Sequence, residues 1–160
     1  MNYTSLKIVE NYNLYKYGTN NTIHKSGNDY QKPTIGYGYD IKQQGFNALD
    51  LNSKVGATII TQEQMDLLKS YCDSLNRLVG ESDIEYSNRT NTIKQNYDNL
   101  ISSIVITQEQ ADTLLINTVS NYAISLNSIL TSNDVTLSSS QQSALISVFY
   151  NTCGSDISTI

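Results

Sequence analysis

Basic residues are scarce in this chain of 160 residues, which has ten lysines and arginines against 15 aspartates and glutamates. The resulting net charge is −5, and no cluster of basic residues occurs, so no binding to nucleic acid is expected. Long hydrophobic runs are missing as well. Nothing approaches the roughly 18 apolar residues of a membrane span. The N-terminal MNYTSLKIVEN has no apolar core of a signal peptide, so the delivery route stays open.

Cysteine, histidine and proline are also rare, with two, one and one copies. Cys72 and Cys153 lie far apart, which favours two buried or partly buried free thiols, with a single disulfide as the alternative. His24 lies in a polar stretch and is expected on the surface rather than as a ligand. No metal motif, phosphate-binding loop or Cys–His signature occurs, so no metal and no cofactor are expected.

The first third of the chain mixes helix and strand patterns. Residues 4–17, TSLKIVENYNLYKY, predict a helix with Thr4 or Ser5 as its N-cap. Residues 33–40, PTIGYGYD, alternate in polarity and predict a strand or hairpin. Residues 41–58 remain ambiguous.

The rest of the chain is helical in pattern. TQEQ occurs at 61–64 and again at 107–110, and each copy is typical of a capping box at the start of a helix. The first of these helices is expected to end at Gly80, and the polar residues 81–99 form an exposed helix or a long loop. A last helix is expected from 138–140 onward. The second TQEQ helix is expected to bury Leu115, Val119, Tyr122, Leu126 and Ile129.

These patterns predict a single α+β domain over residues 1–160 that is mostly α. Residues 1–58 would form a small catalytic lobe with a β-hairpin, and residues 59–160 a helical lobe. Mixed architectures of this kind segregate their helices from a small antiparallel sheet.

Glu10 is the first candidate for chemistry. On the expected first helix it lies four residues after Leu6 and four before Leu14, so it shares a face with apolar side chains. Partial desolvation there would raise its pKa and suit it to donate a proton near neutral pH. The alternative is an ordinary solvated glutamate at a helix end.

Two of only eight glycines lie two apart in the stretch 33–40. A fully extended strand would separate Thr34 from Asp40 by about 20 Å, so both reach one substrate bond only if the chain bends at these glycines. Two carboxylates and a hydroxyl brought together would suit glycoside hydrolysis. The alternative is a hairpin in which Asp40 merely caps the next turn of the chain. The period of two puts on one face Thr34, Gly36, Gly38 and Asp40, and on the other Ile35, Tyr37 and Tyr39.

Three motifs in this order resemble the phage-lysozyme superfamily, muramidases that cleave peptidoglycan. They are a glutamate on the first helix followed by TIGYG, the segment ITQEQADTLLINTVSNY, and the segment SSSQQSALISVFYNTCG. The long gap before TIGYG and the ending GYGYD look closest to the pesticin-like branch, the lysozyme-type domain of a bacterial toxin. The resemblance implies a lysozyme-like fold with Glu10 as general acid, Thr34 positioning water and Asp40 as second carboxylate. Implied for substrate binding are Gly36, Tyr37, Gly38 and Asn151.

The chain departs from the family pattern in three places. Ordinary phage lysozymes have an Asp six residues before the Thr of TIGYG, where this chain has Asn28, so Asp29 is the alternative second carboxylate. Thr152 and Cys153 separate Asn151 from the next glycine. The sequence stops at residue 160, where the family continues through further helices, so the helical lobe is expected to be either truncated, with an exposed apolar patch, or closed in another way.

The expected activity is therefore hydrolysis of the β-1,4 bond between N-acetylmuramic acid and N-acetylglucosamine. Such an enzyme would be bacteriolytic and would act at the bacterial cell wall, in the periplasm or outside the cell. The chain resembles toxin-type members, and a colicin-like toxin, a secreted effector, a phage endolysin and a eukaryotic antibacterial protein all remain open. An immunity or inhibitor protein is a further expected partner. The alternative is a non-catalytic module that binds glycans or proteins on a degenerate lysozyme fold.

Overall fold

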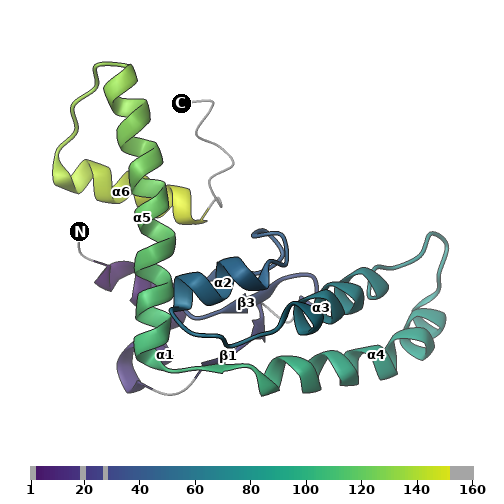
Figure 1. Ribbon diagram of the computed structural model, residues 1–160. Helices are drawn as coiled ribbons and strands as arrows, with labels where there is room; N and C mark the ends of the chain where they lie inside the picture. Colours follow the sequence, from purple (N-terminus) through teal and green to yellow (C-terminus); the bar gives the residue numbers. More distant parts are fainter. Residues whose placement is uncertain (1–2, 19–20, 27–28, 152–160) are drawn as a thin grey trace.

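The computed structural model describes residues 3–18, 21–26 and 29–151 (Figure 1). It is mostly helical with a small antiparallel sheet, as the sequence predicts. The helices are α1 (Thr4–Tyr17), α2 (Ala48–Val55), α3 (Gln62–Ser74), α4 (Asp83–Ser103), α5 (Gln108–Ser132) and α6 (Ser139–Asn151). The strands are β1 (Asn21–Thr22), β2 (His24–Lys25), β3 (Pro33–Ile35), β4 (Tyr39–Asp40) and β5 (Val105–Ile106).

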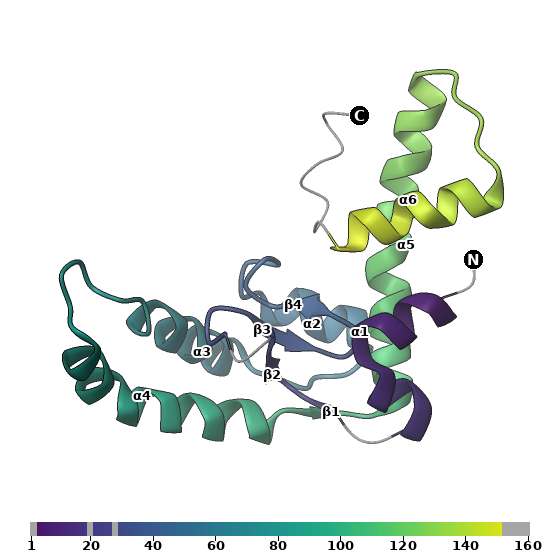
Figure 2. The same cartoon turned by 180° about the vertical axis from the view of Figure 1, so that it is seen from behind.

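The long helix α5 organises the molecule. Helix α2 packs against it, and α6 crosses it farther along (Figure 1). Helices α3 and α4 form an antiparallel pair that extends away from α5, and the strands lie between that pair and α1 (Figure 2). Strand β3 is central in the sheet β2-β3-β4, and β1 pairs with β5 just before α5 begins. None of the helices in the described segments is long and apolar enough to cross a membrane.

Helical periodicity explains how α3 and α4 pack together. Met65, Leu68 and Cys72 recur at spacings of three and four on α3 and are buried, as are Tyr97 and Ile101 on α4. These two apolar stripes face each other within the core. The Cys72 thiol is buried, whereas Cys153 lies outside the described residues.

Both predicted capping boxes are confirmed. The hydroxyls of Thr61 and Thr107 accept the backbone N–H three residues later, and the glutamine at that position returns a bond to the cap's own N–H. A third capping box at Ser82 starts α4, so the polar stretch after Gly80 is a helix. The predicted end of α3 at Gly80 is wrong. The helix ends at Ser74, and Gly80 lies in the following loop.

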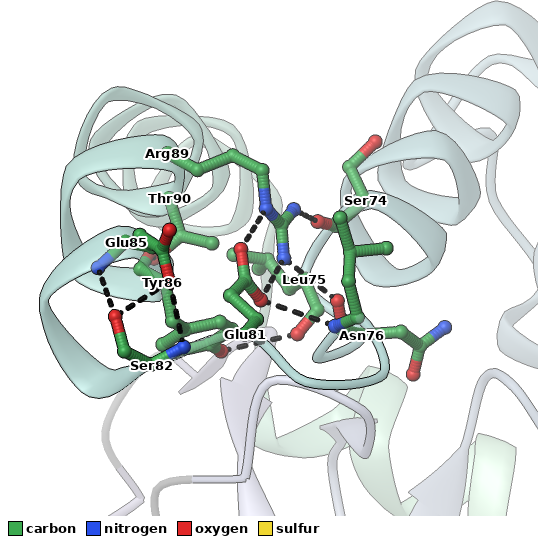
Figure 3. A network of polar contacts seen from close by, with 10 residues as sticks. Ser74, Leu75, Asn76, Glu81, Ser82, Glu85, Tyr86, Arg89 and Thr90 are labelled. Carbon is green, nitrogen blue, oxygen red and sulfur yellow. Dashed lines mark hydrogen bonds and ion pairs between the residues drawn. The ribbon is translucent and has the colours of Figure 1, made fainter.

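A partly exposed ion pair holds that loop and explains why α3 ends early (Figure 3). The Arg89 guanidinium, from α4, donates to both carboxylate oxygens of Glu81 at 2.6 and 2.9 Å. It also donates to the carbonyl oxygens of Ser74 and Asn76, which the end of α3 leaves without helical partners. The Glu81 side chain is only 7% exposed, and the ion pair lowers its pKa to about 2.

Three further expectations need correction. The N-cap of α1 is Tyr3, without a side-chain cap bond, rather than Thr4 or Ser5. His24 lies in strand β2, where its backbone pairs with Thr34, rather than in a polar loop, and it is partly buried. On α5, Leu115, Val119 and Leu126 are buried as predicted, but Tyr122 is only partly buried and Ile129 is 38% exposed, because α6 crosses α5 before its last turns.

Candidate active site

The stretch 33–40 folds into a tight hairpin. Strands β3 and β4 are antiparallel, and Thr34 lies directly opposite Asp40. Gly36 and Gly38 make the reversal with φ of +65° and +89°, backbone values that favour glycine. The predicted bend is confirmed. Residues facing each other in an antiparallel pair have Cα atoms about 4.5–5.5 Å apart, far less than an extended strand would give.

The apolar face of the hairpin anchors it in the core. Ile35, Tyr37 and Tyr39 are all buried, as the alternation predicts. Gly36 lies against Leu114 of α5, because a Cβ added at Gly36 would be 3.5 Å from the leucine methyl carbon Cδ2. The core thus supports the turn through Ile35, Tyr37 and Tyr39 and also covers Gly36, which the alternation puts on the other face. The residues of that face that lie beside a cleft are Thr34, Gly38 and Asp40.

Gly38 makes room for the Glu10 carboxyl. A Cβ added at Gly38 would lie 2.8 Å from Glu10 Oε2, closer than side chains tolerate. The glutamate projects from α1 onto the turn, and partial burial raises the pKa of its carboxyl. The two glycines therefore have two uses, a reversal of the chain and a close approach of Glu10.

The space above the turn is a small cleft of about 150 Å³. Enclosed pockets for small ligands usually measure about 300–1,000 Å³, so this cleft suits one segment of a long chain that continues beyond it. The structure brings together three of the predicted catalytic residues and adds three others. The lining residues are Glu10, Ser26, Lys32, Thr34, Gly38, Asp40 and Tyr150.

Tyr150 is a site residue that the sequence reasoning missed. It comes from α6, 113 residues after Tyr37, and its hydroxyl donates to the Tyr37 carbonyl oxygen. Its ring carbon Cε1 would be 3.4 Å from a Cβ at Gly38. A sequence signal existed, because Ile146 and Tyr150 are four apart on one buried face of the last helix. Ser26 and Lys32 carry no comparable signal.

The hydroxyl of Thr34 and the carboxylate of Asp40 also make local bonds. Thr34 Oγ1 donates to the Lys32 carbonyl oxygen at 3.1 Å. Asp40 Oδ1 accepts the Gln43 N–H at 2.9 Å, so Asp40 caps the next turn and lines the cleft as well. The alternative role expected for Asp40, capping of the next turn, is therefore present, and it leaves the residue in the cleft.

Asp29 lies in a different setting. Its Oδ1 accepts the Gln31 N–H at 2.8 Å and closes the turn between β2 and β3. It is not among the residues that line the cleft. Asn28, Thr152 and the residues after it lie outside the described residues, and for Asn151 the description covers the backbone at the end of α6 but not the side chain.

No potential metal site is found in the segments that the structure describes. Groups of three or more histidine, cysteine, aspartate or glutamate side chains that could hold an ion do not occur there. The cleft offers groups for acid–base chemistry: a carboxyl with a raised pKa, a second carboxylate and a hydroxyl.

Comparison with known proteins agrees with this fold. The family model described as phage lysozyme matches residues 77–159, just over half of the chain. The chain therefore belongs to the phage lysozyme family, and its α+β fold is lysozyme-like. Glycoside hydrolysis of peptidoglycan is the general activity that this family implies. The match covers α4, α5 and α6, whereas Glu10, Thr34 and Asp40 lie before it. No curated protein and no solved structure matches the chain.

Proposed function

We propose that this protein is a muramidase that cleaves the β-1,4 bond between N-acetylmuramic acid and N-acetylglucosamine. Glu10 is the general acid, Asp40 the second carboxylate and Thr34 the residue that positions water. One observation carries the proposal. The Glu10 carboxyl, with its raised pKa, shares one cleft with the paired residues Thr34 and Asp40.

In the reaction, Glu10 gives its proton to the glycosidic oxygen as the bond from that oxygen to the sugar C1 breaks. Water then supplies the oxygen that bonds to C1 and gives up one proton, either to Asp40 acting as base or to the Glu10 carboxylate that has just donated its own. Asp40 either activates this water or stabilises the positive charge that develops on the sugar ring. Because the Thr34 hydroxyl donates its hydrogen bond to the Lys32 carbonyl, its lone pairs are available to accept a hydrogen bond from the water and hold it.

The hairpin supplies part of the substrate-binding surface. Of the three turn residues, Gly38 lines the cleft under the Glu10 carboxyl, whereas Gly36 and Tyr37 are buried and support the turn from the core side. Asn151 follows Tyr150 at the end of α6. Tyr39 and Asp40 directly follow the GYG segment in the sequence. This order supports a pesticin-like arrangement of the catalytic carboxylates. We place the activity at the bacterial wall, in the periplasm or outside the cell, as a bacteriolytic toxin with an immunity or inhibitor protein as partner.

Wall lysis by Glu10→Gln tests the general acid. A neutral amide cannot donate the proton, so the rate should fall by about a hundredfold or more while the fold is kept. Glu63→Gln, an exposed glutamate in the first turn of α3, is the matched control and should lyse at the wild-type rate. The measurements are turbidity of purified peptidoglycan and circular dichroism. Full activity of Glu10→Gln would remove this residue from the mechanism.

Paired Asp40→Asn and Asp29→Asn variants in the same assay test the second carboxylate. We expect the large loss in Asp40→Asn, because Asp40 lines the cleft and Asp29 closes a turn. A loss in Asp29→Asn alone would reassign the role. Sedimentation with peptidoglycan tests the remaining alternative, a binding module on this fold. A wild-type protein that sediments with the wall but does not cut it would be such a module.

A further inference from the structure

Helix α1 is broken at the residue that follows Glu10. Asn11 has φ of −155° and ψ of 79°, whereas the residues on either side are helical. The break divides α1 into a segment that ends with Glu10 and a short second segment that runs to Tyr17. A backbone break of this kind leaves N–H and carbonyl groups without helical partners, and these need replacements.

The Asn11 side chain uses both ends of its amide. Oδ1 accepts the N–H of Leu14, three residues on, at 3.1 Å, which is the bond of an N-cap to the second segment. Nδ2 donates to the carbonyl oxygen of Gly36 at 3.2 Å. One side chain therefore connects the broken helix to the hairpin turn, 25 residues later.

These contacts link α1 and the hairpin turn in a closed ring beside the cleft. Asn11 follows Glu10 in the chain, its amide holds the Gly36 carbonyl, and Gly38, two residues later, lies against Glu10 Oε2. We propose that Asn11 is a positioning residue, whose amide holds the Glu10 carboxyl in place over the Gly38 turn. The proposal rests on the proposed role of Glu10 as general acid.

Only a side chain with an acceptor and a donor this close together makes both bonds. Aspartate would keep the acceptor for Leu14 but would set a carboxylate oxygen against the Gly36 carbonyl, where a donor is needed. Alanine would lose both bonds. The Asn11 backbone lies at negative φ, and alanine and aspartate have the same Cβ as asparagine, so these substitutions change the side-chain bonds rather than the sterics of the backbone.

Charged and titratable groups around Glu10 come from several elements. Lys32 and Asp40 line the cleft beside the hairpin, and Tyr150 lines it from α6. Lys7, one turn before Glu10 on α1, is paired with Asp112 of α5 at 2.8 Å. None of these groups changes in Asn11→Ala, so a change in the titration of Glu10 would report its position.

Asn52 provides a matched control. Its Oδ1 accepts the N–H of Ile59 at 2.9 Å and its Nδ2 donates to the carbonyl of Ile60 at 2.8 Å, the same pair of bonds in a part of α2 that does not line the cleft. Asn11→Ala, Asn11→Asp, Asn52→Ala and Asn52→Asp would be compared by kcat and KM on soluble peptidoglycan fragments, by thermal unfolding, and by carbon-13 NMR titration of the glutamate carboxyls.

We expect kcat to fall by roughly a hundredfold in Asn11→Ala with a smaller change in KM, because displacement of a catalytic group by about 1 Å has this effect. The pKa of Glu10 should fall toward its ordinary value, since a released carboxyl is better solvated. Asn11→Asp, which keeps the Leu14 bond, should lose kcat as well. Both Asn52 variants should lower the unfolding temperature and leave kcat and the Glu10 pKa unchanged.

The positioning role is overturned if the folded Asn11 variants match the Asn52 variants in kcat and in the Glu10 pKa. It is also overturned if Asn11→Asp keeps the wild-type kcat, because the bond to Gly36 would then be dispensable. An inactive wild-type protein would instead contradict the proposed hydrolysis. In that case the NMR titration alone decides, and a Glu10 pKa that moves in Asn11→Ala but not in Asn52→Ala supports the positioning role.

Discussion

Gly38 joins two requirements at one Cα. Its φ of +89° turns the chain, and the absence of a Cβ lets the Glu10 carboxyl lie against the backbone. In most turns a glycine is needed only for its φ. Gly45 is an example, with φ of +76° and nothing within 4 Å of an added Cβ. The raised pKa of Glu10 follows from its partial burial in this position.

Gly38→Ala should therefore impair catalysis more than its backbone strain explains. The added methyl would push the carboxyl away from the turn, and we expect wall lysis to fall by roughly a hundredfold. Gly45→Ala imposes a similar backbone cost, about 1–2 kcal/mol, without the contact. Lysis rates and unfolding temperatures of the two variants would be compared. Equal lysis rates would show that the Gly38 contact has no role in the reaction.

At the scale of elements, the α3–α4 pair depends on a charged contact in the connecting loop. The Arg89–Glu81 ion pair binds the carbonyls at the end of α3 and, through Glu81 Oε2, the Leu78 N–H within the loop (Figure 3). Because Arg89 donates to groups on both sides of the loop, the pair connects three consecutive segments. Its removal would leave carbonyls and a backbone N–H unsatisfied.

Acid should weaken this contact. Glu81 has a folded pKa of about 2 against an ordinary value of 4.5, so it binds fewer protons folded than unfolded. Its stabilising contribution is complete above the ordinary value and is lost as the pH falls from about 4.5 toward 2. Thermal unfolding at several pH values would measure this. The wild type should lose stability across this window. Glu81→Gln should be less stable than the wild type at pH 7, but its stability should depend less on pH below 4.5.

Glu109→Gln is the control for that comparison, because Glu109 is exposed and lies in the first turn of α5, away from the loop. It should keep the pH dependence of the wild type. If Glu81→Gln loses stability between pH 4.5 and 2 as steeply as the wild type, other carboxylates account for the acid sensitivity.

At the scale of the whole molecule, an apolar groove lies between the last turns of α5, the loop that follows them, and α6. Its volume is about 430 Å³. Most of the side chains that line it are apolar. The apolar patch expected on the helical lobe stays a prediction, and this groove is where it would lie. The groove is lined by Leu126, Ile129, Leu130, Asn133, Val135, Leu137, Leu145 and Phe149.

Dye binding tests whether this groove is open in solution. The wild-type protein should enhance the fluorescence of an anilinonaphthalene sulfonate dye, because the groove offers dry apolar surface. Ile129→Lys should reduce the enhancement, whereas Ile124→Lys, at a residue of α5 that is exposed but does not line the groove, should not. Fluorescence titrations with thermal unfolding as a check would measure this. A wild-type protein that binds no dye would show that the groove is closed.

Local patterns in the sequence were enough to predict much of this fold. The two TQEQ capping boxes form because their bonds span only three residues. The bend at Gly36–Gly38 forms because glycine alone adopts these φ values without strain, and the alternation then buries Ile35, Tyr37 and Tyr39. Local sequence patterns, together with the family resemblance, also lead to the proposed roles of Glu10, Thr34 and Asp40.

Tertiary structure decided the features that depend on partners distant in sequence. Helix α3 ends at Ser74 rather than at Gly80 because Arg89, 15 residues on, binds its terminal carbonyl. Tyr150 reaches the cleft only because α6 crosses α5 and its hydroxyl meets the Tyr37 carbonyl. Asn11 breaks α1 where the Gly36 carbonyl lies within reach of its amide. A local pattern specifies bonds between near neighbours, whereas these bonds form only after packing has brought separate elements together.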